Sequence, residues 1–143
     1  DFLAEFVLDR VGRMSAGTAA LCEAAGTATV ADNLTAALTT LFGSVAVAVV
    51  ALVTYRDELR ARLRRTWPAG VPVLTEAAIM IEAYLTAERE LGRLTPGADV
   101  RTIAPTLIGA GHLLFADRTG APPEPAAVHR MVATVLAGAT PPR

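Results

Sequence analysis

The side chains of this sequence best suited to chemistry are its two histidines, His112 and His129, and its one cysteine, Cys22. A nucleophilic triad brings a serine or cysteine together with a histidine and an acid. The histidines fall on different expected helices, Cys22 is remote in sequence, and no HExxH, GxSxG, Walker or GxGxxG pattern occurs. We therefore expect no catalytic residue, no metal site and no cofactor, and the protein is not expected to be an enzyme.

Carboxylates gather on the expected helix that precedes Gly92. Glu82 and Glu90 are spaced to share a helix face, but a carboxylate pair from one helix without histidine is weak evidence for a metal site, and a solvated surface is the expected interpretation. Glu88 falls close to the apolar stripe of the same helix. A buried carboxylate must be paired or protonated. Its candidate partners are Arg56, Arg89 and Arg93.

His112 stands within the apolar run LIGAGHLLF. Such a histidine is either a core or interface residue with one hydrogen bond, or the polar anchor of a ligand cavity. Tyr84 and Trp67 have the same two interpretations, as packing residues or as ligand contacts. The residues alone leave these alternatives open.

Composition limits the function classes. At 143 residues the chain is expected to form one domain. The formal net charge is −1, whereas a free-standing nucleic-acid binder usually shows a basic excess. This segment by itself is therefore not expected to bind the phosphates of a nucleic acid. The run Arg56–Arg65 is either a phosphate patch or, because Asp57 and Glu58 interrupt it, a solvated face. A single cysteine excludes an internal disulfide and fits a reducing, cytoplasmic location.

Apolar residues at helical spacing, with no strand pattern, predict an all-α chain of about six helices. Helix-ending residues separate two of them at Gly92–Gly97, and Pro105 predicts a kink or a late start in the helix after Asp99. The expected helices are Phe2 to Cys22, a cap at Thr29 or Asp32 to Tyr55, Arg56 to Arg65, Leu74 to Leu91, a cap at Asp99 to Phe115, and Pro125 to Ala137.

The second of these helices needs separate consideration because Asn33 to Tyr55 contains no charge. A helix that is apolar all round is either buried or crosses a membrane. A membrane span needs about 20 mainly apolar residues, and the strongly apolar part, Val45 to Val53, is shorter than that. We expect a central buried helix and no membrane association.

The block AYLTAERELGRLTPGADVRTIAPTLIGAGHLLF, Ala83 to Phe115, resembles the C-terminal regulatory domain of TetR-family transcriptional regulators. In many members one helix ends in an A-E-x-x-x-G-x-L-like phrase, and a D-x-x-x-x-A segment opens the first dimerisation helix. The residues at these places are Ala87, Glu88, Gly92, Leu94, Asp99 and Ala104. The closing HRMVATVLAGAT resembles the last helix of the family, and the order of helices fits along the whole chain.

This resemblance implies that residues 1–143 form one effector-binding and dimerisation domain, a six-helix orthogonal, antiparallel bundle. The last two helices would form a four-helix bundle with those of a second copy. The residues expected at this interface are Leu107, Gly111, Leu114, Val128, Met131, Val132 and Val135.

The resemblance also implies a pocket enclosed by the central helices. Because few polar groups are available there, the effector is expected to be small and mainly apolar. The expected pocket lining is Leu38, Phe42, Val45, Trp67, Ile81, Tyr84 and His112.

The DNA-binding helix-turn-helix that defines the family is not in this sequence, and we expect it upstream of Asp1. Operator DNA would be bound through that domain. The chain is thus expected to belong to a ligand-responsive regulator, most often a repressor. The alternative is a helical homodimeric interaction module without a ligand.

Overall fold

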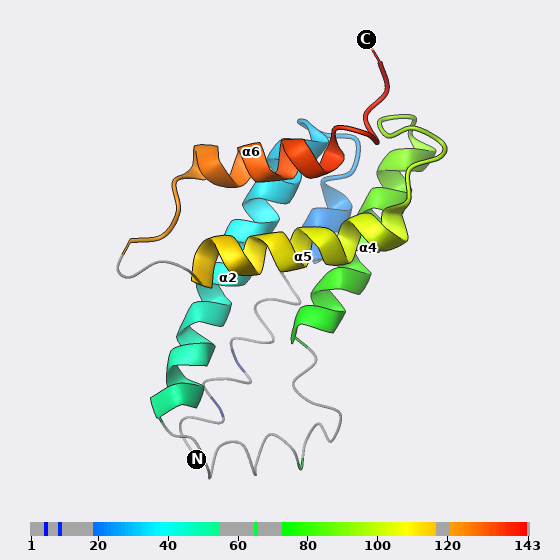
Figure 1. Ribbon diagram of the computed structural model, residues 1–143. Helices are drawn as coiled ribbons and strands as arrows, with labels where there is room; N and C mark the ends of the chain where they lie inside the picture. The colour runs from blue at the N-terminus through cyan, green and yellow to red at the C-terminus, as the bar shows by residue number, and fades with distance from the viewer. Residues whose placement is uncertain are drawn as a thin grey trace.

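The computed structural model describes residues 5, 9, 19–54, 65, 73–116 and 121–142 (Figure 1). All regular structure within these ranges is helical, so the predicted all-α class is confirmed for the described part of the chain. The helices are α2 (Val30–Thr54), α4 (Val73–Glu90), α5 (Val100–Ala116) and α6 (Pro125–Leu136), and residues 19–23 are also helical. The expected helices at Phe2–Cys22 and Arg56–Arg65 lie largely outside the described residues.

α5 and α6 run side by side in opposite directions, α5 across both α4 and α2 and α6 across α2 (Figure 1). α5 packs against α4, α2 and α6, and α6 also packs against α2. α5 is therefore the element that joins the other three. Of the helices that are described, none has the length and apolar character of a membrane span.

The core lies where these four helices meet. In the first half of α2, Leu34, Leu38 and Leu41 are all buried, as expected of a central helix. Leu91, the expected last residue of α4, instead follows the last residue of that helix, Glu90, and is 59% exposed. Buried partners from the other segments include Ile81, Leu85, Leu94, Ala104, Leu107, Val128, Val132 and Leu136.

Two helices start at side-chain caps that the sequence predicts. Thr29 caps α2, because its Oγ1 accepts a hydrogen bond from the backbone N–H of Asp32 at 3.0 Å. Asp99 caps α5 by accepting hydrogen bonds from both the backbone N–H and the hydroxyl of Thr102. α5 begins directly after Asp99 and includes Pro105, so the late start that Pro105 suggested does not occur.

α4 ends in a Schellman motif built on Gly92. The N–H of Arg93 donates to the carbonyl of Glu88 and the N–H of Gly92 donates to that of Arg89, both at 3.0 Å. This closure requires the left-handed backbone of Gly92, whose φ is 77°. The chain then turns sharply, which buries Leu94 and places the side chain of Arg93 back beside Glu88.

Replacing Asp99 with alanine is expected to lower the melting temperature at neutral pH, because α5 loses its cap. The hydrogen bond from the Thr102 hydroxyl holds the pKa of Asp99 below its ordinary value of 3.8. A carboxyl group with a lowered pKa stabilises the fold above its ordinary pKa and loses that contribution as pH falls through the lowered one. The difference between the two proteins should therefore be full at pH 7 and shrink below pH 3.8.

Thermal unfolding followed by circular dichroism across this pH range measures the effect. Glu124→Ala is the matched control, because Glu124 precedes α6 without a capping hydrogen bond from its side chain. Equal effects of the two substitutions at neutral pH would contradict the role of Asp99.

Candidate functional site

The most polar feature of the interior is the carboxylate of Glu88 on α4. Within the described residues, Glu88 is the charged side chain that is fully buried. Its Oε1 accepts a hydrogen bond from the backbone N–H of Gly26 at 2.7 Å. Its Oε2 accepts hydrogen bonds from the hydroxyl of Tyr84 at 2.8 Å and from Nη2 of Arg93 at 3.1 Å. The predicted pairing of Glu88 with an arginine is confirmed for Arg93. Arg89 donates instead to the carbonyl of Ala98 at 2.9 Å.

Tyr84 and Asn33 extend this network to α2. The amide nitrogen of Asn33 donates to the Tyr84 hydroxyl at 3.0 Å and to the carbonyl of Thr27 at 2.9 Å. Burial raises the pKa of Tyr84 above its ordinary value, so the hydroxyl remains protonated and donates to Glu88. The hydroxyl of Tyr84 is thus satisfied inside the fold and does not point into a cavity as a free polar group.

The turn at residues 24–29 takes part in this network through the N–H of Gly26 and the carbonyl of Thr27. Its backbone reverses through left-handed conformations at Gly26, with φ of 85°, and Ala28, with φ of 46°. Arg93 Nη2 also donates to the carbonyl of Thr27, at 2.9 Å. The network therefore fixes the turn to the end of α4 and to the start of α2.

The residues expected to line a central pocket are mostly packed in the core. Leu38, Phe42, Ile81 and Tyr84 are each no more than 2% exposed and belong to one hydrophobic cluster. His112 is exposed, and its ring centroid lies 6.1 Å from that of Phe42. Trp67 and the side chain of Val45 lie outside the described residues.

The residues expected at a dimer interface divide into two groups. Leu114, Met131 and Val135 are half-buried at the edge of the core. Those that lie within the core of the chain itself are Leu107, Gly111, Val128 and Val132. The side of α6 that carries Val128 and Val132 therefore packs within its own chain and is not available to a second copy.

The outward face of α5 carries no charge. A side chain at every third or fourth position of a helix lies on the same face. Leu113, at 70% exposure, is the most exposed large apolar residue among those described. The exposed residues that share its face are Thr102, Pro105, Thr106 and Gly109. Such an apolar and uncharged strip is typical of a protein contact surface.

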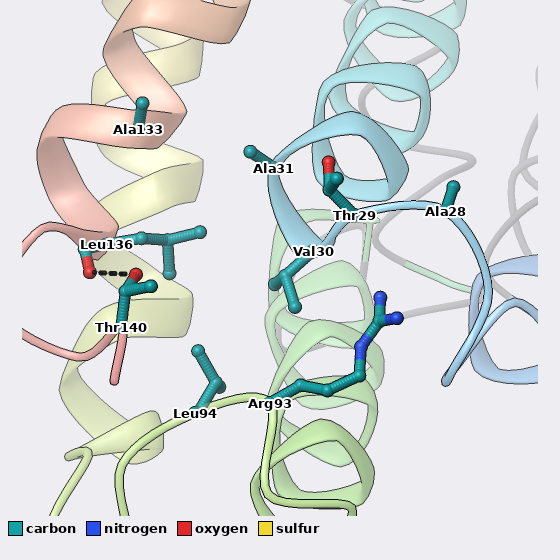
Figure 2. Close-up of a pocket in the computed structure, with 9 residues that line it drawn as sticks. All are labelled: Ala28, Thr29, Val30, Ala31, Arg93, Leu94, Ala133, Leu136 and Thr140. Atoms are coloured by element: carbon teal, nitrogen blue, oxygen red, sulfur yellow. Dashed lines mark hydrogen bonds between the residues drawn. The ribbon is translucent and has the colours of Figure 1, made fainter. Parts of the chain in front are cut away.

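A groove of about 380 Å³ opens between the start of α2, the turn after α4 and the end of α6 (Figure 2). The side chains of Val30, Leu94 and Leu136 point into it, and Arg93 reaches along one end toward Ala28 and Thr29 (Figure 2). The remaining lining residues are Ala31, Ala133 and Thr140. No local pattern in the sequence marks this groove, because its walls come from segments far apart in the chain.

No family model, curated protein or solved structure matches this chain. The described residues hold no group of three histidine, cysteine, aspartate or glutamate side chains placed to bind a metal ion. The geometry of the described residues offers a buried polar network, an uncharged helix face and an apolar groove with a single cation.

Proposed function

We propose that this chain is the regulatory domain of a TetR-like, ligand-responsive transcriptional regulator, most often a repressor in that family. In this proposal, α5 and α6 pair with the same helices of a second copy. The bundle binds a small, mainly apolar effector, and an upstream helix-turn-helix binds operator DNA. Effector binding acts by favouring one arrangement of the dimer over another, which requires different affinities for the two.

The residues that carry the resemblance support this proposal because several of them have a distinct structural task. Gly92 closes α4 in the left-handed conformation and Asp99 caps α5. Glu88 joins the end of α4 to the turn at residues 24–29. Leu94 and Ala104 are buried. The motif from Glu88 to Ala104 thus corresponds to one structural unit, in which α4 ends, the chain turns and α5 begins.

The observation that carries the dimer is the uncharged outer face of α5. Gly109 on this face has open space around it, so a second helix can approach the backbone closely. Leu113 and the half-buried Met131 and Val135 add apolar area. Among the exposed residues of α5, only Arg101 near its start is always charged. A paired surface of this kind is depleted in charge at its centre.

Replacing Leu113 with aspartate is expected to convert the dimer to monomers. An aspartate at the centre of the contact would be desolvated without a partner, which costs several kcal/mol and is comparable to the gain from one buried apolar anchor. Size-exclusion chromatography with light scattering gives the mass. Ile79→Asp is the matched control, because Ile79 is 53% exposed but lies on α4. Dimers that persist in Leu113→Asp and dissociate in Ile79→Asp would place the contact on α4.

A helical dimer without a ligand is the second candidate function. The close packing of Leu38, Phe42, Ile81 and Tyr84 in the core favours it, because these residues fill the region expected to hold the effector. A panel of apolar compounds separates the two functions. Binding stabilises the fold by RT ln(1 + [L]/Kd), which is about 2.7 kcal/mol at a hundredfold excess of free ligand over Kd, and it therefore raises the melting temperature. A panel without any such rise would favour the interaction module.

A further inference from the structure

We infer that the groove between α2, the turn after α4 and α6 is a binding site for a small amphiphilic monocarboxylate. This site goes beyond the proposed function, because it is separate from the central pocket expected for the apolar effector. Along α2, Val30 in the groove precedes Phe42 by twelve residues, which is roughly 18 Å of helix.

The shape of the groove suits a small ligand with an apolar body. Its volume of about 380 Å³ falls at the lower end of the roughly 300–1,000 Å³ typical of ligand pockets. Leu94 and Leu136 are nearly inaccessible to water and form its floor, and the half-buried Val30 forms a wall. Small side chains at Ala31 and Ala133 keep the space between α2 and α6 open (Figure 2). An alkyl chain or a small ring placed in the groove removes its own apolar surface and the exposed part of Val30 from water.

The charge of the groove selects the head group. Arg93 is the only charged residue of its lining, so the groove offers one cation and no carboxylate. Both hydrogen bonds that the described residues accept from Arg93 come from Nη2, which leaves Nη1 and Nε as donors. A carboxylate placed beside them forms a charge-assisted hydrogen bond, about twice as strong as a neutral one.

Arg93 is also held in place before a ligand arrives. Its guanidinium is anchored to Glu88 at 3.1 Å and to the carbonyl of Thr27 at 2.9 Å. The side chain therefore loses little rotational freedom on binding, which favours affinity.

Octanoate and octan-1-ol are the probes that test this site, because they share an alkyl chain and differ in charge. Isothermal titration of the whole chain at pH 7 should show octanoate binding at least tenfold more tightly than octan-1-ol. In the double variant Glu88→Gln/Arg93→Gln, which removes both charges of the pair, octanoate should weaken at least tenfold while octan-1-ol is unchanged. Equal affinities for the two probes, or no binding of octanoate, would overturn the assignment.

A groove-filling variant tests the location without disturbing the buried pair. Ala133 is an exposed residue of α6 that lines the groove, so Ala133→Trp should fill the groove and abolish octanoate binding. Ala126 is exposed on the same helix outside the groove, so Ala126→Trp should retain binding. Octanoate binding that survives Ala133→Trp would overturn the site. Binding lost in Phe42→Ala but kept in Ala133→Trp would place the ligand in the central pocket, in agreement with the proposed function and against this inference.

Discussion

Replacing Arg93 with methionine is expected to lower the free energy of unfolding by about 3–5 kcal/mol, the range for removing one partner of a buried ion pair. Glu88 is 0% exposed, so its carboxylate would remain in the interior without a cation. The carbonyl of Thr27 would also lose a hydrogen-bond donor. Urea denaturation followed by circular dichroism measures the change.

Arg89→Met is the control for this experiment. Arg89 sits at the same end of α4, and among the described residues its side chain donates one hydrogen bond, to the carbonyl of Ala98, so its loss should cost about 1 kcal/mol. Glu88→Gln introduced into the Arg93→Met protein should recover part of the loss, because it removes the unpaired charge while keeping an acceptor for Gly26. If Arg93→Met cost no more than Arg89→Met, the ion pair would not be a stabilising contact.

Replacing Phe42 with alanine is expected to cost about 3–5 kcal/mol of stability, since it leaves a cavity in the core. Phe42 is 2% exposed and its ring stacks on Phe115 with centroids 5.4 Å apart. The more specific expectation concerns Gly111 on α5. A Cβ atom at Gly111 would lie 2.6 Å from Cε2 of Phe42, closer than two carbon atoms can approach.

Gly111→Ala should therefore destabilise the wild-type protein by about 1–3 kcal/mol, the cost of overpacking. In Phe42→Ala the space is free, and the same substitution should become neutral or stabilising by up to about 1 kcal/mol, the difference in helix propensity. A double-mutant cycle measured by urea denaturation gives the coupling. Gly109→Ala is the control, because a Cβ there meets nothing within 4 Å and its effect should be the same in both backgrounds. Additive effects of Phe42→Ala and Gly111→Ala would mean that the two helices are not in close contact there.

Local signals in the sequence predicted much of the described fold. Capping residues at Thr29 and Asp99, the glycine at Gly92 and the proline at Pro125 bound the helices, so the predicted ends lie within a residue or two of those observed. Each of these signals acts through residues within one helical turn. The all-α class follows from the same periodicity.

Contacts between distant segments could not be predicted in this way. Gly26 and Glu88 are 62 residues apart, and nothing in the sequence around Gly26 marks its N–H as the partner of a carboxylate. The sequence of α6 shows an apolar stripe, but it does not say whether that stripe faces the same chain or another copy. The structure places Val128 and Val132 against the core of their own chain, which confines any dimer contact to other positions.

The hydrogen bond from Gly26 to Glu88 has a mechanical consequence. The helical residues 19–23 end directly before the turn that contains Gly26, and this turn is clamped to α4 by Glu88 and to α2 by Asn33. If residues 19–23 move, the turn transmits the movement to α4 directly through the Gly26–Glu88 hydrogen bond, without a movement of α2. The turn acts as a rigid joint, and hydrogen exchange at the Gly26 amide should be as slow as at the amides in the middle of α4.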